Sequence, residues 1–395
     1  MSALELDQSG QAGGQSVPSG PAGQAGQAGR GGPWIVSPGF DLSLVAVPLG
    51  LSALFLLLPP RADVPLWAFL FLVVAFDVAH VWATLYLGPL DPEVRRRRPW
   101  LMLLPVPVIF LVAYRLHLHE PALYWTALAY VAIHHFAAQQ WGFVALYRAL
   151  GGERDPLDRH LDRWATWTGA LGPVLLWHAD PERHMDWFHH GERFLVRIDP
   201  ALQGDIVAGM LLVGGLWVAR QVQHLLRGRL VLGKAAWVLA TWISWSVGLL
   251  LAQSPLLALA AINLLHGLPF LALVWVRLER GQAAARGGLL RAVSGPRRLW
   301  AFYGLLLILA LVEEGLWDGL HWGTYLPGLT GWSRPQLSEG QASALVALLA
   351  LPQTVHYYLD AWLWKMDGSN PDLHLALGLP GPGQRPVTGP AGPGP

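Results

Sequence analysis

The chain has 395 residues, of which 53% are hydrophobic and only 13% are charged. Soluble domains carry about 25% charged residues because their surface faces water, so this composition argues against an ordinary soluble enzyme and favours a membrane protein. The formal net charge of +1 gives no cationic excess, and we therefore expect no nucleic-acid partner. The absence of cysteine excludes disulfides, thiolate metal ligands and iron–sulfur clusters.

The two ends of the chain differ in composition from its centre. Residues 1–37 are rich in Gly, Gln, Ala and Ser, and residues 369–395 are rich in Gly and Pro. Such segments cannot bury enough apolar area to offset the entropy of ordering, so we expect two disordered tails. The intervening residues 38–368 form the predicted transmembrane domain.

Long apolar segments follow one another through this central part. A helix needs about 20 apolar residues to cross the hydrocarbon layer of a bilayer. The sequence therefore predicts an all-α, polytopic bundle of about ten transmembrane helices, of which the fifth is the shortest. In chain order they lie near residues 43–60, 64–87, 101–117, 122–147, 164–178, 205–226, 235–253, 255–276, 299–317 and 341–364.

The loops between these segments alternate between rich and poor in Lys and Arg. The loop after the second segment holds Arg95, Arg96, Arg97 and Arg98, whereas residues 118–121 and 252–255 hold no Lys or Arg. Because positively charged loops stay in the cytoplasm, the alternation predicts a multi-pass protein of the cell (inner) membrane with both termini cytoplasmic. A lipid-headgroup site at the arginine run is the alternative interpretation of that run.

Five of the 15 histidines lie inside the predicted spans: His80, His134, His135, His266 and His356. They are on the second, fourth, eighth and tenth spans, which all run from outside to inside in the predicted topology. Counted from the outer end they lie roughly 11 to 16 residues deep, which is a spread of about 7 Å at the helical rise. We therefore expect four helices to present imidazoles at one level of the membrane.

Each of these positions has a carboxylate or an amide one helical turn away, where the two side chains share a face. Such a group can hold the second ring nitrogen of a metal-bound histidine. The partners are Asp77 for His80, Gln139 for His135, Asn263 for His266, and Gln353 and Asp360 for His356.

This pattern predicts a metal site. Ligation by His and Asp without Cys favours iron, manganese, copper or zinc, and iron is the usual metal for oxygen chemistry. One ion is expected, or two if Asp77 and Asp360 are ligands themselves. The choice between His134 and His135 stays open, although Gln139 favours His135.

Other interpretations of the same residues remain. The histidines and aspartates could relay protons or bind a cation in a membrane transporter, two of the histidines could hold a b-type haem, or the set could be structural.

The segment containing His184, His189 and His190 resembles a histidine box, but its spacing and predicted outer location favour an interfacial segment. Glu313 and Glu314 could line an outer vestibule, and a plain interface position is the alternative.

Four short segments around these histidines resemble the Brp/Blh-type bacterial membrane oxygenases, which cleave carotene to retinal. The first surrounds His80, and the others are AYVAIHHFAAQQWG, AINLLHGLPF and LPQTVHYYLDAWLW, of which the last contains His356 and Asp360 as a His-x-x-x-Asp pair. The sequence departs from that family at Phe270, where a second histidine is expected, and at Thr84, where an aspartate is expected. The resemblance implies a related iron site for dioxygen chemistry on a lipid-soluble substrate.

Taken together, the sequence predicts a metal-dependent, iron-containing membrane oxidoreductase or oxygenase that acts on an apolar small molecule within the lipid bilayer. His80, His135 or His134, His266 and His356 are the predicted ligands. Asp77 and Asp360 are predicted at the catalytic centre, as further ligands or as hydrogen-bond partners that orient the imidazoles.

Overall fold

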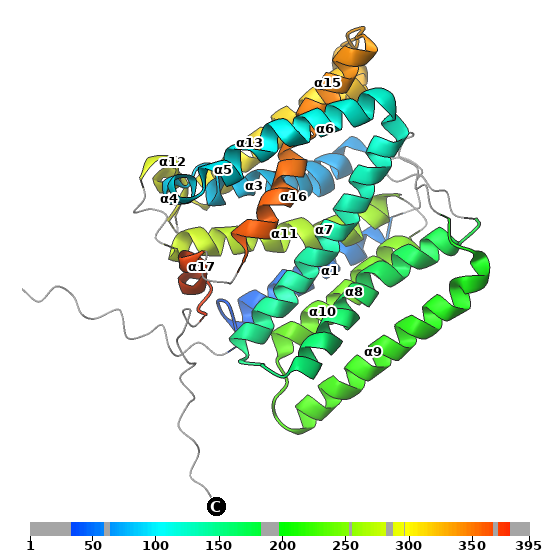
Figure 1. Cartoon of the computed structure of the whole chain (residues 1–395), viewed down its shortest axis with the longest axis vertical. Helices are drawn as coiled ribbons and strands as arrows, with labels where there is room; N and C mark the ends of the chain where they lie inside the picture. The colour runs from blue at the N-terminus through cyan, green and yellow to red at the C-terminus, as the bar shows by residue number, and fades with distance from the viewer. Residues whose placement is uncertain are drawn as a thin grey trace, which may run out of the picture.

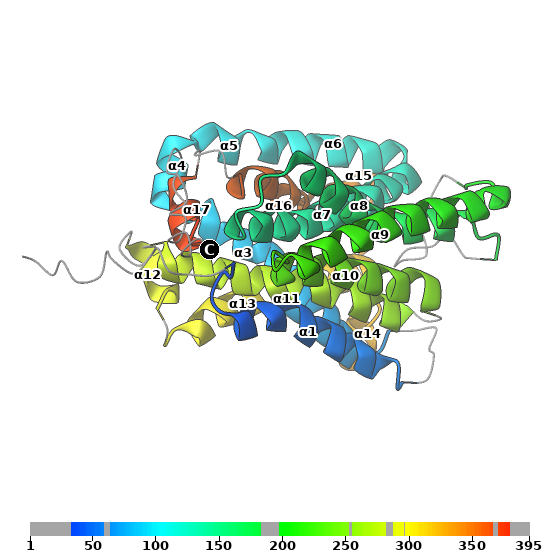
Figure 2. The same cartoon turned by 90° about the horizontal axis from the view of Figure 1, so that it is seen from below.

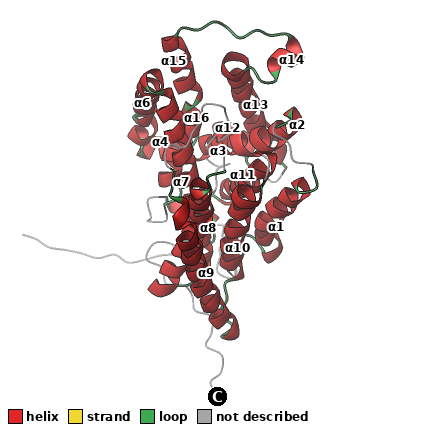
Figure 3. Ribbon diagram, turned by 90° about the vertical axis from the view of Figure 1, so that its right-hand side faces the viewer, coloured by secondary structure: helices red, strands yellow, loops and turns green. Residues whose placement is uncertain are grey.

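The computed structural model describes residues 33–58, 64–182, 197–252, 255–281, 287–295, 297–365 and 370–379. Over these ranges the chain is built of helices and the connections between them, with no strand (Figure 3). The all-α prediction is therefore confirmed.

Most of the mass lies in long helices, whose axes run in broadly one direction when the molecule is seen from below (Figures 1 and 2). The long helices are α1 (Pro38–Phe55), α6 (Pro105–His119), α7 (Pro121–Leu150), α8 (Pro156–Ala179), α9 (Gln203–Leu226), α10 (Leu232–Ser246), α11 (Pro255–Arg280), α13 (Leu299–Trp317), α15 (Glu339–Leu349) and α16 (Leu351–Leu363).

Shorter elements extend or connect the long ones. The short α-helices are α2 (Leu66–Ala68), α3 (Ala79–Leu87), α4 (Pro92–Arg97), α5 (Pro99–Leu103), α12 (Gly288–Val293), α14 (Leu326–Thr330) and α17 (Pro371–Ala376). Three π-helical segments, η1 (Phe69–Val78), η3 (Val247–Leu251) and η5 (Asp318–Trp322), and one 3₁₀ turn, η2 (Pro200–Leu202), complete the described elements.

Eight helices in the described part of the chain are long and apolar enough to cross a membrane. They are Pro38–Phe55, Leu66–Leu87, Pro99–His119, Pro200–Leu226, Leu232–Leu251, Leu256–Arg280, Leu299–Trp322 and Glu339–Leu363. They match eight of the ten predicted spans. The other two, 122–147 and 164–178, fall in α7 and α8, which are long enough but less apolar. A membrane protein is therefore indicated, while a count of exactly ten spans is not confirmed.

Helix α11 lies at the centre of the bundle. Its most apolar stretch is 83% buried, against 6% for that of α9 and 11% for that of the span containing α6. Helix α11 packs against α1, α10, α3, η1 and α17, and Figure 1 shows α9 at the edge, beside α8. A side chain on α11 can therefore meet partners from several helices at once.

The close approach of α11 to η1 depends on Gly267. A Cβ at this position would meet the backbone carbonyl of Phe76 in η1, with the carbonyl carbon at 2.8 Å. Carbon atoms in contact are normally about 3.5–4.0 Å apart, so only glycine lets the two backbones lie this close. Gly267 adjoins His266, and Phe76 lies one turn before His80, so the contact brings two predicted ligands together.

Both predicted tails contain residues that pack in the bundle, so the composition placed their boundaries too far inward. Ile35 is buried, and its N–H donates to Asp41 at 2.6 Å; the Tyr147 hydroxyl donates to the same carboxylate at 2.7 Å. At the other end, Leu373 and Leu377 on and after α17 are buried, and α17 packs on α11. Short apolar runs inside Gly- and Pro-rich sequence explain both differences.

Candidate metal centre

Four buried histidines meet in the middle of the bundle. His80 comes from α3, His135 from α7, His266 from α11 and His356 from α16, and one ring nitrogen of each lies within 4.8 Å of those of the others. Their exposed fractions are 1%, 8%, 0% and 1%, respectively, so the group is shielded from the surface. Four helices thus bring one imidazole each to the same place in the bundle.

The spacing within this group suits one metal ion. The Nε2 atoms of His135 and His356 are 3.2 Å apart, and the rings of His80 and His266 are 4.4 Å apart between centroids. Two imidazole nitrogens bound to one tetrahedral ion at the usual bond length of about 2.0–2.1 Å would be separated by about 3.4 Å. A small contraction of the group would therefore bring the four nitrogens to bonding distance.

Unsatisfied polar atoms support the same interpretation. Within the described part of the chain, neither ring nitrogen of His80 nor of His266 has a hydrogen-bond partner, although all four atoms are buried. Buried polar atoms without partners cost roughly 1–3 kcal/mol each, and native structures avoid them. A cation among the four imidazoles would satisfy these atoms, and neutral imidazole is a good ligand for iron, copper, zinc and nickel.

His356 is oriented by a residue that the sequence did not single out as its partner. Its Nδ1 lies 2.6 Å from the Thr84 hydroxyl and 3.7 Å from the Asp360 carboxylate, while its Nε2 faces His135. The ring thus presents Nε2 to the group and keeps Nδ1 for its neighbours, as metal-bound histidines do. Thr84 lies on α3 and His356 on α16, so no spacing rule within one helix could have paired them.

Asp77 occupies the equivalent position beside His80. Its Oδ1 is 3.6 Å from His80 Nδ1, and its Oδ2 accepts a hydrogen bond from the Asn263 amide at 3.2 Å. Both predicted carboxylates, Asp77 and Asp360, therefore lie next to an imidazole. The group of nitrogens within 4.8 Å of one another contains the four histidines alone.

The three predicted amide partners make different contacts from those expected. Gln139 donates to the backbone oxygen of His266 at 2.8 Å. Gln353 donates to the Tyr357 hydroxyl at 2.6 Å, and Asn263 serves Asp77. Gln139 and Asn263 thus find acceptors on a neighbouring helix and join ligand-bearing helices, whereas the Gln353 bond stays within α16.

His134 lies apart from the four-histidine group. It is exposed, and its ring is 5.4 Å from that of Trp167 on α8. Successive residues on a helix point about 100° apart, so His134 and His135 cannot face the same site. Of the two alternatives, His135 is the one that the fold brings into the group.

Aromatic rings enclose the imidazoles. Phe136 stacks on His266 with centroids 3.7 Å apart, and Tyr357 lies 4.4 Å from His135. Phe270 is 5.5 Å from both His80 and His356. The position at which the resemblance expects a further histidine is thus filled by an apolar wall. The contacts of these aromatic rings with histidines on other helices could not be predicted from the sequence.

A cavity of about 410 Å³ adjoins the group. His135, Tyr357 and Asp360 stand on its wall, and most of its remaining lining is apolar. Exposed residues of α7, Val131 and His134, also line it, so the cavity extends to the surface of that helix. Ligand sites of small apolar molecules typically have about 300–1,000 Å³ and a few polar groups of this kind.

The remaining candidate residues from the sequence are not part of the four-histidine group. Glu313 is buried and accepts a hydrogen bond from the Trp82 indole at 2.6 Å, and Glu314 interacts electrostatically with Glu313 and Asp77. Glu313 is thus buried in the bundle, whereas Glu314 is half-buried. The histidine-box segment with His184, His189 and His190 lies outside the described residues.

Comparisons with protein-family models, with curated proteins and with solved structures gave no match to this chain. The resemblance to Brp/Blh-type oxygenases therefore stays a prediction that rests on the short histidine motifs.

Proposed function

We propose that the chain is a metal-dependent membrane oxidoreductase, an oxygenase that uses iron held by His80, His135, His266 and His356. The observation that carries this proposal is the convergence of four buried imidazoles from four helices, two of them with both ring nitrogens lacking a partner. Manganese, copper and zinc suit the same donors. A set of neutral imidazoles favours a transition metal over calcium or magnesium, which prefer oxygen ligands.

Iron bound by such a set supplies dioxygen activation. The chain's own residues would orient and protect that chemistry. Thr84 fixes the ring of His356, and Asp77 and Asp360 lie where they can accept a proton from, or hydrogen-bond to, an imidazole Nδ1. The aromatic wall of Phe136 and Phe270 excludes water from the imidazoles.

The substrate in this proposal is an apolar small molecule that enters the cavity beside His135. The cavity places such a molecule against one edge of the four-histidine group, and its opening along α7 would face the bilayer. Tyr357 and Asp360 are the polar groups available to position it. We place the protein in the cell membrane with both termini in the cytoplasm, because the Arg-rich loops alternate in that sense.

Metal analysis tests the proposal. Protein purified in detergent should contain about one equivalent of metal, and His356→Ala should remove most of it because one of four ligands is lost. Asp360→Asn should lower metal affinity roughly 10–100-fold, as loss of a group that orients a ligand typically does. His178→Ala is the matched control: His178 is also buried, but it bonds Tyr130 at 2.8 Å, away from the group. Equal metal in the His356 and His178 variants, or no metal in the wild type, would refute a metal enzyme.

A cation- or proton-coupled transporter is the second candidate. The buried carboxylates favour it, because Asp77, Glu313 and Glu314 interact with one another within the bundle and Asp77 also lies beside His80. Such a row could pass protons to or from the imidazoles. Ion flux in reconstituted vesicles that depends on Glu313, together with no stoichiometric metal, would favour the transporter.

A further inference from the structure

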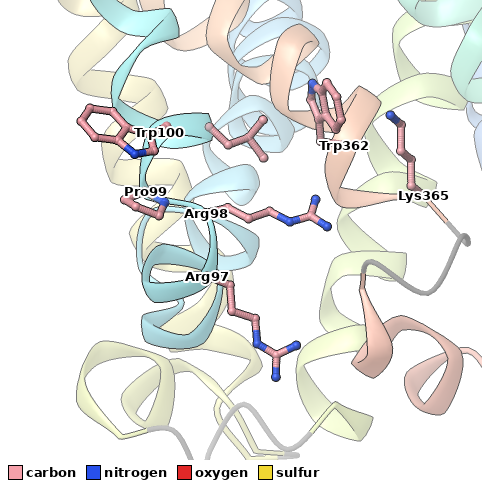
Figure 4. A pocket seen from close by; sticks show the side chains of 7 residues that line it. Arg97, Arg98, Pro99, Trp100, Trp362 and Lys365 are labelled. Atoms are coloured by element: carbon pink, nitrogen blue, oxygen red, sulfur yellow. The ribbon is translucent and has the colours of Figure 1, made fainter.

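A second cavity, of about 360 Å³, lies between the α4–α5 corner and the end of α16 (Figure 4). It is separate from the four histidines and shares no lining residue with the cavity beside His135. Its lining consists of Arg97, Arg98, Pro99, Trp100, Leu101, Trp362 and Lys365.

Cationic side chains converge on this cavity from both sides. Figure 4 shows Arg98 extending from the α4–α5 corner toward the side that carries Trp362 and Lys365. The Lys365 ammonium lies 3.5 Å from the centroid of the Trp362 ring, a cation–π contact that holds it at the wall. Among the residues that the structure describes, those that line the cavity include three cations and no carboxylate. The cavity therefore suits an anion.

The carboxylate on α4, Glu93, is already engaged. It accepts hydrogen bonds from Arg97 at 2.5 Å and from Arg96 at 2.9 Å, on the exposed face of α4. These bonds, that from Arg97 first, hold the pKa of Glu93 below its ordinary value. Glu93 fixes Arg97 at one rim, and Arg98 and Lys365 are the other two cations among the described residues that line the cavity.

The surroundings of the cavity are those of a membrane interface. It lies at the ends of two helices that are apolar enough to cross a membrane, Pro99–His119 and Glu339–Leu363. Trp100, Leu103 and Leu104, on the first of these helices, are 75%, 64% and 60% exposed. Tryptophan at the end of an apolar span is typical of the headgroup level of the bilayer.

We propose that this cavity binds the phosphate group of an anionic phospholipid, with Arg98 and Lys365 as its principal ligands. A guanidinium pairs with two phosphate oxygens at once, and an ammonium adds a compact positive charge. The acyl chains would lie along the exposed apolar surface that begins at Trp100. A bound headgroup would join α4 and α5 to α16.

A lipid explains the apolar surface beside the cavity, which free phosphate does not. A free anion would interact with the cations alone. The exposed tryptophan and leucines, however, continue from the cavity along the same helix. An apolar surface of this kind offers the acyl chains of a lipid a contact that an inorganic ion cannot use.

Lipid titration followed by native mass spectrometry tests the site. Delipidated full-length protein in detergent is titrated with phosphatidylglycerol and, separately, with zwitterionic phosphatidylcholine, in the presence and absence of inorganic phosphate. The variants are Arg98→Gln and Lys365→Gln. Arg95→Gln is the matched control, because Arg95 is an exposed arginine of α4 that bonds the Pro89 carbonyl and does not line the cavity.

The wild type should bind one phosphatidylglycerol in clear preference to phosphatidylcholine. Each cavity variant should weaken that binding about fivefold, which is the usual contribution of one cation at an anionic membrane surface. Arg95→Gln should change it less than twofold, and each variant should keep the wild-type thermal unfolding midpoint in the absence of lipid.

Three results would overturn the proposal. The first is equal weakening by Arg95→Gln and Arg98→Gln, which would show that total charge rather than this cavity attracts the lipid. The second is the absence of any preference for phosphatidylglycerol. The third is displacement of the lipid by inorganic phosphate at equal affinity, which would assign the cavity to the free ion. A variant with a lowered unfolding midpoint is replaced by Arg98→Lys or Lys365→Arg, which should retain most of the binding.

Discussion

Replacing Gly267 with alanine tests how closely α11 approaches η1. A Cβ at this position would lie 2.8 Å from the carbonyl carbon of Phe76. This is about 0.7 Å or more inside the normal contact distance of two carbon atoms. The atoms in the way belong to the backbone, so no rotation of a side chain can relieve the overlap, and one of the two helices must move.

Two effects of the substitution oppose each other. Alanine is the better helix former by about 0.8–1.0 kcal/mol, whereas forcing a methyl group into packed surroundings typically costs about 1–3 kcal/mol. Because the obstruction is backbone, we expect the second effect to win, with a net loss of up to about 2 kcal/mol of unfolding free energy. On the proposed function, bound metal should fall as well, since His80 and His266 would move apart.

Gly304→Ala is the matched control for this substitution. Gly304 is in the middle of α13, and a Cβ there would meet nothing within 4 Å, so only the propensity term applies and stability should rise by up to about 1 kcal/mol. Both variants are measured by reversible denaturation in detergent and by metal content. A Gly267 variant as stable as the Gly304 variant would refute the close approach, and a destabilised variant with full metal would show that the contact does not position the histidines.

Three further outcomes are expected. Thr84→Val removes the hydroxyl that holds His356 Nδ1 without changing side-chain shape much, so metal affinity in a titration should fall roughly 10–100-fold; unchanged affinity would exclude an orienting role. A cysteine introduced at Arg96 should resist an impermeant external reagent in intact cells, because the Arg-rich loops are predicted to be cytoplasmic; rapid labelling would reverse the topology. Asp41→Asn should lower the free energy of unfolding by about 1–3 kcal/mol, since its carboxylate accepts from the Ile35 N–H and the Tyr147 hydroxyl; wild-type stability would mean that neither bond contributes.

The sequence could predict that histidines from four helices meet, for a geometric reason. The position of a residue along a predicted span follows from the number of residues between it and the end of that span, and the sequence gives this number directly. The sequence determines less well which face of a helix turns toward its neighbours. His134 and His135 were therefore alternatives, and the fold brings His135 into the four-histidine group. The apolar character of eight spans was equally visible, whereas α7 and α8 carry more polar residues than a span usually tolerates.

Contacts between helices could not be predicted from spacing. The bond between Thr84 and His356 joins residues 272 apart in the chain, and Gln139 reaches the backbone of His266, 127 residues away. Which neighbour a polar side chain meets depends on how the helices pack, and a single sequence carries little information on that.

The dispersal of the four histidines along the chain has a consequence for the order of assembly. His135 and His356 are 221 residues apart, and His356 lies on the last long helix of the bundle. The nascent chain therefore cannot complete the set until α16 has been synthesised and has packed against the earlier helices. Any ion bound by all four imidazoles must load after membrane insertion is essentially finished, and its binding free energy would then stabilise the assembled protein rather than guide its insertion.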